Sequence, residues 1–112
     1  MGNGKADMPD SNDVTFSGVI ITLPSWFTIH GNKKGLIFTI RSEELFQKSD
    51  GTSSSHPNDM DVEVLGRSAD KYFQDLHVAQ YCVVKGYIRT DIINGIKKTR
   101  IRAYKITYPG GY

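Results

Sequence analysis

The chain is predicted to fold as an all-β protein, a small antiparallel barrel with one short helix between its third and fourth barrel strands. Two observations lead to this prediction. Segments with the two-residue alternation of strands recur along most of the 112 residues, and only one segment shows the period of an amphipathic helix. A single helix supplies too few crossovers for a parallel α/β sheet, so simple α+β packing is the main structural alternative.

Length and composition indicate one globular domain with a modest core. Hydrophobic residues make up 38% of the chain and charged residues 23%, which is typical of globular proteins. No apolar run approaches the ~20 residues of a transmembrane helix, and no secretory segment is evident, so we expect a cytoplasmic protein. Cys82 is the only cysteine, which excludes an internal disulfide and leaves a cysteine-based zinc site short of ligands.

Domain boundaries follow from where the apolar pattern starts and stops. Residues 1–12 lack an apolar period and are expected to be a disordered tail. The folded domain is expected to span residues 13–108, with 109–112 as its C-terminal end. Within it, the polar segment 47–59 contains no run of apolar residues and is predicted to be a flexible surface loop.

The first half of the domain is predicted to contain three strands. Segment 14–23 is rich in β-branched residues, and Pro24 ends it or turns a corner. Segments 26–29 and 36–41 are the next two strands. The residues between them include two glycines and an asparagine, which tolerate positive φ, so a hairpin is expected there.

A fourth strand and the helix follow. Segment 60–65 alternates valines with acids, as a half-buried strand does. Ser68 is a plausible helix N-cap, and Asp70 stands where the positive end of the helix dipole favours an acid. Ala69, Tyr72, Phe73 and Leu76 then share one helical face.

The segment 81–106 is the most informative part of the chain and is predicted to be a β-hairpin with Asn94-Gly95 as its turn. One face carries small apolar residues suited to a core: Cys82, Val84, Gly86, Ile88, Ile101 and Ala103. The other face mixes cations with aromatic rings: Tyr81, Val83, Lys85, Tyr87, Arg89, Lys98, Arg100, Arg102 and Tyr104. A nucleic-acid backbone with unstacked bases requires such a mixture.

Core residues elsewhere are predicted from the same alternation. They are Phe16, Ile20, Phe38, Ile40, Val62, Val64 and Phe73. Trp26 and Phe27 are neighbours on one strand and therefore point to opposite sides; Phe27 is the better candidate for the core because it shares its side with Ile29. The order of elements, with a bent first strand and a closing hairpin, describes an oligonucleotide-binding (OB) fold.

Charge is distributed unevenly along the chain. Residues 1–61 contain five Lys/Arg and eight Asp/Glu, a net charge of −3, whereas residues 62–112 contain nine and four, a net charge of +5. This segregation favours a polyanionic partner for the second half more than the total charge of +2 does. A solvated basic sheet face without a ligand is the alternative.

Several segments resemble bacterial single-stranded DNA-binding proteins and their relative, primosomal replication protein N. They are Val14–Gly18 with Pro24, Ser42–Phe46, Val62–Ala69 and Val84–Thr90, in that order and spacing. The resemblance implies an OB fold, self-association into homodimers or homotetramers, and binding of single-stranded DNA independent of sequence.

The chain also departs from that family. Asp59, Met60 and Asp61 stand where the tetrameric proteins carry a stacking aromatic residue, and Ile92 and Ile93 replace an aromatic residue of the last hairpin loop. Phe46 matches one of the family's stacking positions. The chain ends without the family's acidic tail, as the shorter primosomal proteins do.

The predicted nucleic-acid-binding residues are cations for phosphates and rings for bases. Those of the last hairpin are Lys85, Tyr87, Arg89, Lys97, Lys98, Arg100, Arg102 and Tyr104, and those elsewhere are Trp26, Lys33, Lys34, Phe46, Lys48 and Arg67. The alternatives are a subunit interface for the hairpin face, solvated turns for the hairpin lysines, a packed edge for Trp26 and an acid pair for Arg67. The prediction depends on Arg100 and Arg102 being free of acidic partners.

The expected function is sequence-independent binding of single-stranded DNA, in replication, recombination or primosome restart, by a nucleoid-associated homo-oligomer with a possible replication-protein partner. RNA remains open as a ligand. The alternative is an OB-fold scaffold for protein partners whose nucleic-acid binding is weak or lost. An enzyme is not expected: His30, His56 and His77 lack metal-ligand spacing, and Glu43 and Glu44 would point apart on a strand. No cofactor or metal is expected.

Overall fold

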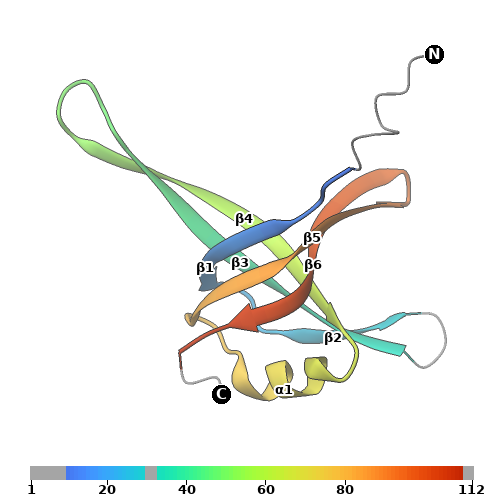
Figure 1. The fold of residues 1–112 in the computed structure, drawn as a ribbon. Helices are drawn as coiled ribbons and strands as arrows, with labels where there is room; N and C mark the ends of the chain where they lie inside the picture. Colours follow the sequence, from blue (N-terminus) through green and yellow to red (C-terminus); the bar gives the residue numbers. More distant parts are fainter. Residues whose placement is uncertain (1–9, 30–32, 110–112) are drawn as a thin grey trace, which may run out of the picture.

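The structure is a computed structural model that describes residues 10–29 and 33–109. In this part of the chain it contains six strands and one helix (Figure 1). In chain order they are β1 (Val14–Ile20), β2 (Ser25–Ile29), β3 (Lys33–Gln47), β4 (Ser53–Leu65), α1 (Ser68–Asp75), β5 (Tyr81–Ile93) and β6 (Ile96–Thr107).

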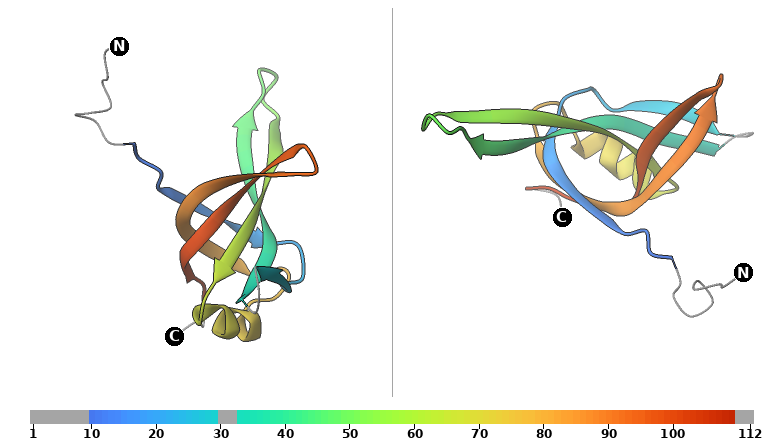
Figure 2. Two further views of the ribbon diagram at one scale, coloured as in Figure 1. Left: turned by 90° about the vertical axis from the view of Figure 1, so that its right-hand side faces the viewer. Right: turned by 90° about the horizontal axis from the view of Figure 1, so that it is seen from above.

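The strands form a closed barrel. Their order in the sheet is β1-β5-β6-β4-β3-β2. β1, at one end of this order, also pairs with β3 near the other end, and this pairing closes the sheet into a barrel. β4 and β6 pair in parallel, and the other pairings of the described strands are antiparallel. β1 and β2 are the two halves of one bent barrel strand, and α1 follows the third barrel strand and lies across one end of the barrel (Figures 1 and 2). This is the predicted OB fold.

Closure depends on the absence of a side chain at Gly18. One edge of β1 pairs with β5 through Gly18 and Cys82, while the other edge meets β3 through Val19 and Arg41. A Cβ atom on Gly18 would overlap the backbone carbonyl of Arg41. The two strands can therefore cross closely only if this position is glycine.

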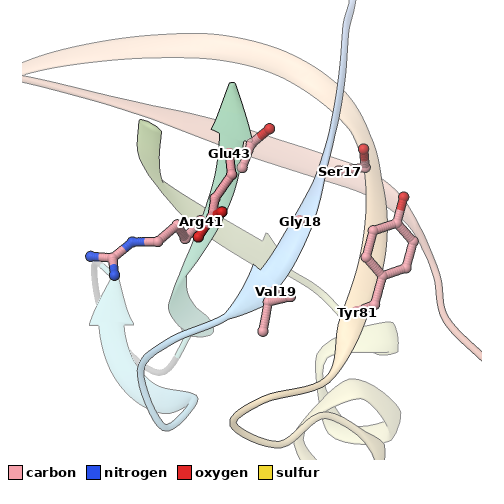
Figure 3. A pocket seen from close by; sticks show the side chains of 7 residues that line it. Ser17, Gly18, Val19, Arg41, Glu43 and Tyr81 are labelled. Atoms are coloured by element: carbon pink, nitrogen blue, oxygen red, sulfur yellow. The ribbon is translucent and has the colours of Figure 1, made fainter. Parts of the chain in front are cut away.

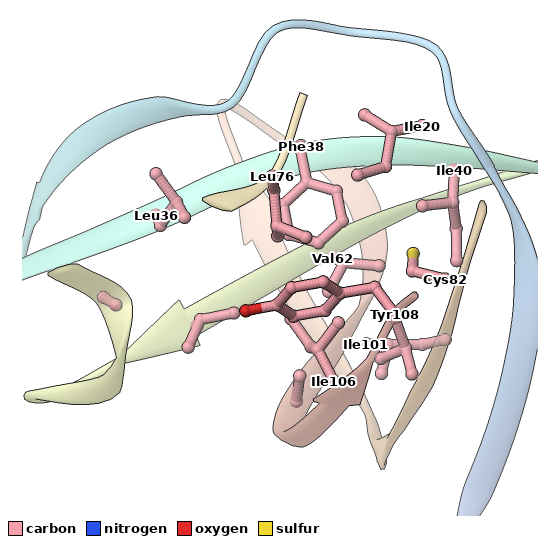
Figure 4. Close-up of a cluster of buried hydrophobic side chains, with 14 residues drawn as sticks. Ile20, Leu36, Phe38, Ile40, Val62, Leu76, Cys82, Ile101, Ile106 and Tyr108 are labelled. Carbon is pink, nitrogen blue, oxygen red and sulfur yellow. The ribbon is translucent and has the colours of Figure 1, made fainter. Parts of the chain in front are cut away.

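The core lies inside the barrel and consists of inward-pointing residues of every long strand (Figure 4). Of the predicted core residues, five are buried: Ile20, Phe38, Ile40, Val62 and Val64. Phe16 is partly buried and packs against them. Phe73 is 44% exposed, so its prediction as a core residue is wrong; on α1, Ala69 and Leu76 are buried instead.

The prediction of a flexible loop over residues 47–59 is wrong. β3 and β4 continue beyond the barrel as a paired ribbon as far as Gln47 and Ser53, and only a short turn joins them. Thr52 closes that turn: its hydroxyl and its backbone N–H donate to the Asp50 carboxylate, which lowers the pKa of Asp50. Backbone pairing holds a polar ribbon together without an apolar face, so the polar composition was misleading.

Two smaller predictions also change. Arg67, not Ser68, is the N-cap residue of α1, and it makes no side-chain capping bond. The predicted disordered tail reaches Asn12, but the Asn12 side chain donates to the carbonyl of Ile88 (2.8 Å) and accepts from its N–H (2.9 Å). Asn12 therefore contacts β5 two residues beyond the last pair of β1 with β5, Val14 with Gly86. Residues 1–9 lie outside the described part. No described helix is long and apolar enough to span a membrane.

The crossing at Gly18 gives a first prediction. Gly18→Ala should lower the free energy of unfolding by about 3 kcal/mol, because β1 and β3 must separate to accept the methyl group. Thermal or urea unfolding measures the loss. Ser17→Ala, one residue away on the same strand, is the control and should change stability little. Equal stability of the Gly18→Ala protein and the control would contradict this account of barrel closure.

The buried thiol gives a second prediction. Burial raises the pKa of Cys82 to about 11 from a usual value of 9.0. The protonated thiol is favoured in the folded state, so its contribution to stability is present below pH 9 and is lost as pH rises from about 9 to about 11. At pH 8, a thiol reagent should modify the folded protein at least roughly 100-fold more slowly than the unfolded protein. Similar rates in both states would show that Cys82 is accessible.

Candidate nucleic-acid interface

The last hairpin forms as predicted, with Asn94 and Gly95 both at positive φ in its turn. Alternation along β5 and β6 puts cations and rings on the outside of the barrel. We call this surface the outer ribbon face: Lys85, Tyr87, Arg89, Lys98, Arg100, Arg102 and Tyr104. Pairing places Tyr87 opposite Arg102 and Arg89 opposite Arg100, so the cations and a ring are direct neighbours.

A bulge at the barrel end of the ribbon keeps Tyr104 on this face. Lys85 pairs with Lys105, but the next residue, Gly86, pairs with Ala103, which leaves Tyr104 without a partner across the ladder. Tyr104 is 64% exposed, between buried Ala103 and exposed Lys105. The extra residue turns two consecutive side chains outward and widens the outer ribbon face.

Arg100 and Arg102 do not lie free of acids, so the condition on which the sequence-based prediction of the binding face depended is not met. The side chain of Glu63 on β4 is only 2% exposed. Its Oε2 accepts from Nη2 (2.8 Å) and Nε (3.3 Å) of Arg102, and its Oε1 lies 3.6 Å from Nε of Arg100. Burial lowers the pKa of Arg102, but the hydrogen bonds and charge of Glu63 outweigh it and raise the pKa above its usual value. Arg102 therefore stays charged.

The other cations of this face differ in whether an acid holds them. Arg89 forms a 3.3 Å ion pair with Asp91 of the same strand. Lys85 and Lys98 form no ion pair with a described residue. The two lysines therefore carry the free charge of the outer ribbon face, and the arginines carry charge that is already partly balanced.

A cleft of about 450 Å³ runs beside the ribbon, between it and β2. We call it the arginine cleft; it is lined by Phe27, Thr28, Glu63, Arg89, Asp91, Ile93, Arg100 and Arg102. The β2–β3 and β5–β6 hairpins project on the same side of the barrel, whereas the β3–β4 ribbon projects on the other (Figures 1 and 2). The cleft is thus built from segments that lie far apart in the sequence.

Phe27 lines this cleft, and Trp26 does not, which reverses the prediction for these neighbours. Trp26 pairs with Leu36, a core residue, and its ring lies 5.1 Å from the ring of Phe73 on α1. Trp26 is 37% exposed and forms a packed edge of the barrel. Phe27 pairs with Gly35 on the outer side of the sheet.

The remaining predicted site residues are dispersed. Lys34 lies 5.9 Å from the centroid of the Trp26 ring, and the side chain of Lys33 lies outside what the structure describes. Phe46 and Lys48 stand at the tip of the β3–β4 ribbon, away from the cleft. Arg67 caps α1 and forms no acid pair within the described chain.

Lys97, also a predicted site residue, does not lie on the outer ribbon face. It pairs with Ile92, and alternation puts both on the side of the ribbon opposite to Lys98. Three exposed isoleucines, Ile92, Ile93 and Ile96, surround the turn.

The outer surface of β3 and β4 is acidic rather than basic. Arg41 donates to both carboxylate oxygens of Asp59, at 2.7 and 3.0 Å, which lowers the pKa of Asp59 and raises that of Arg41. Thr39 donates to Asp61 at 2.7 Å. The carboxylates of Asp59 and Asp61 are thus held by neighbouring side chains of β3.

A second cleft, of about 550 Å³, lies where β1 crosses β3. Figure 3 shows Arg41 and Tyr81 extending to opposite sides of β1, with Gly18 between them. Arg41 is the one guanidinium in the lining of this cleft, and it is already bound to Asp59. The cleft therefore offers an anionic ligand fewer cationic groups than the arginine cleft does. No group of three metal-binding side chains occurs among the described residues.

Two site residues, Phe27 and Glu63, were missed by the sequence analysis. Glu63 alternates with Val62 and Val64, which correctly places it outside the core but does not reveal that arginines of β6 cover it. The glycine opposite Phe27 was a usable signal, since a large ring often packs over a glycine on a neighbouring strand.

Comparisons with known proteins agree with the fold. No protein-family model matches the chain, and no curated protein matches it. Among solved structures, it is similar to a deletion mutant of the single-stranded DNA-binding protein from Thermus aquaticus, with a TM-score of 0.76 and 21% identity over 90% of this chain. The chain spans about half the length of that protein, 51%.

Two other structures match most of both chains. The small single-stranded DNA-binding protein from Streptomyces coelicolor has a TM-score of 0.66 and 20% identity, over 90% of this chain and 97% of that one. A Plasmodium falciparum SSB in complex with ssDNA has a TM-score of 0.76 and 15% identity, over 88% and 95%. At these identities, the similarity establishes the OB fold.

The buried carboxylate gives a third prediction. Glu63→Leu should lower the free energy of unfolding by about 3 kcal/mol, because it leaves two largely covered guanidinium groups without their acid. Glu63→Gln should cost less, since an amide oxygen still accepts from Arg102. Chemical denaturation measures both. The control is Asp59→Asn, which removes the charge of an exposed ion pair. A loss in Glu63→Leu no larger than in the control would contradict the importance of Glu63.

Proposed function

We propose that this protein binds single-stranded DNA, independently of sequence, on the outer ribbon face and in the adjoining arginine cleft. One observation supports this most: an OB barrel places exposed cations and rings of β5 and β6 beside a cleft between two projecting hairpins. OB folds bind oligonucleotides on the face of the second and third barrel strands, here β3 and β4, and at the loops that join strands 1–2 and 4–5, here the β2–β3 and β5–β6 hairpins beside the arginine cleft. Rings stack on the bases and cations contact the phosphates.

Within this proposal, Lys85 and Lys98 bind phosphates through free charge, and Tyr87 and Tyr104 supply exposed rings. The protein would act in replication, recombination or primosome restart as a homodimer or homotetramer in the cytoplasm, with a replication protein as a possible partner. Light scattering with and without a ~35-nucleotide strand measures the oligomer and its loading, since one OB fold covers ~4–16 nucleotides.

A protein-interaction scaffold is the second candidate. It is favoured by the acidic pairs on β3 and β4, by the balanced charge of the arginines, and by exposed apolar side chains at both ribbon tips, such as Leu45 (77%) and Ile92 (73%). Capture of a replication protein that survives nuclease treatment, together with absent DNA binding, would support this function.

The DNA-binding proposal predicts a salt-dependent affinity. Anisotropy of a labelled ~35-nucleotide oligo(dT) should show binding at low salt that weakens steeply, with a log–log slope of about −0.7 for each phosphate contact. Lys85→Gln and Lys98→Gln should each reduce the slope by about 0.7.

Lys97→Gln is the matched control, because it removes the same charge from the opposite side of the ribbon and should leave the slope unchanged. Absent binding at low salt, or an affinity that does not depend on salt, would overturn the proposal. Equal effects of Lys97→Gln and Lys98→Gln would show that the outer ribbon face is not the binding surface.

A further inference from the structure

We propose that the arginine cleft holds one nucleotide of the bound strand, with its base stacked on Phe27 and its phosphate bound by Arg100. This inference rests on the proposed function and names the residues that would make the closest contact with the strand.

The first observation is the position of the Phe27 ring. A Cβ atom on Gly35 would overlap Cζ and Cε1 of Phe27 and would lie 2.8 Å from Cδ2 of Leu65. The ring therefore rests on the β3 backbone at Gly35, beside Leu65. Support from the glycine backbone holds one side of the ring in place while the side chain lines the cleft. A ring fixed in this way loses little conformational entropy when a base stacks on it.

The second observation concerns the hydrogen bonds of Arg100. Its side chain is only 16% exposed, yet its guanidinium makes no hydrogen bond with another described residue, and its nearest acid atom is Glu63 Oε1 at 3.6 Å. A guanidinium carries five N–H donors, and none of the Arg100 nitrogens is among the buried unpaired atoms of the described residues, so these donors are open to a ligand in the cleft. A phosphate in the cleft would accept from them.

Glu63 acts as a positioning residue for this site. Its Oε2 is used by Arg102, while Oε1 is buried and has no hydrogen-bond partner among the described residues. The carboxylate attracts the Nε side of Arg100 and so leaves the terminal nitrogens, which form bidentate contacts with phosphate, free of any described partner.

The size of the cleft and its other lining residues agree with a single nucleotide. Its volume of about 450 Å³ is within the ~300–1,000 Å³ range of small-ligand pockets. Thr28 adds a hydroxyl on the β2 side, and Arg89 a second guanidinium on the β5 side, which Asp91 of the same lining holds in an ion pair. The cleft thus has a ring, a hydroxyl and cations on different walls.

The test compares variants in their binding of a ~12-nucleotide oligo(dT), a length that one OB fold can cover. Phe27→Leu should weaken binding about tenfold through lost stacking, and Phe27→Trp should keep or improve the affinity. Phe73→Leu is the matched control, because Phe73 is an exposed ring outside the cleft, and it should bind like the unchanged protein.

Arg100→Gln should weaken binding and reduce the salt slope by about 0.7, whereas Lys48→Gln, a charge removed at the far ribbon tip, should do neither. Photocrosslinking of the unchanged protein to an oligonucleotide containing 5-iodouracil, followed by mass spectrometry, should yield a crosslink at Phe27. This readout does not depend on whether Phe27→Leu folds.

The outcomes separate the two proposals. If the unchanged protein binds, but Phe27→Leu and Arg100→Gln bind equally well and no crosslink forms at Phe27, the nucleotide site is overturned while DNA binding stands. If the unchanged protein does not bind any strand at low salt, the proposed function itself fails.

Discussion

β1 must pair with two strands at once, and the rest of the structure depends on this constraint. Gly18 lets its backbone approach the carbonyl of Arg41, and Gly86 allows a similar approach at the bulge, where a Cβ atom would overlap the carbonyl of Arg102. These contacts draw the sheet into a narrow barrel that Phe38, Ile40 and their neighbours fill. Because the barrel is closed, alternation assigns each side chain of its long strands either to the core or to the outside.

The outside of the barrel is organised around Glu63. Parallel pairing of β4 with β6 puts Glu63 beside Arg102, and the next outward residue of β6 is Arg100. A carboxylate with 2% exposure would be costly alone, but two guanidinium groups compensate for it and are oriented by it. The same contacts that stabilise this surface therefore determine which donors remain for a ligand.

Local sequence signals were sufficient for much of this architecture. Asn94-Gly95 predicted the hairpin, and the alternation around Cys82 predicted its buried face, because both depend on neighbouring residues. The errors arose where contacts are non-local. Alternation shows that Phe27 and Trp26 point to opposite sides of the sheet but not which of them points outward. The pairing of Phe27 with Gly35 shows that Phe27 does. Burial of Glu63 likewise depends on arginines about forty residues later.

The ion pairs of the arginines with acids also affect how strongly binding of a polyanion to this surface would depend on salt. Where acids balance the cations, as at Arg89, Arg102 and Arg41, fewer counterions are released for each phosphate bound. On the proposed function, attraction to the phosphate backbone would then rest mainly on the free lysines, Lys85 and Lys98.

On the proposed function, stacking of bases on exposed rings would add to these phosphate contacts. The acidic surface of β3 and β4 acts in the same direction, since it repels a strand that leaves the ribbon on that side. On the proposed function, a bound strand would therefore follow the outer ribbon face and the arginine cleft, where Phe27, supported by the backbone of Gly35, adds a ring to the cations.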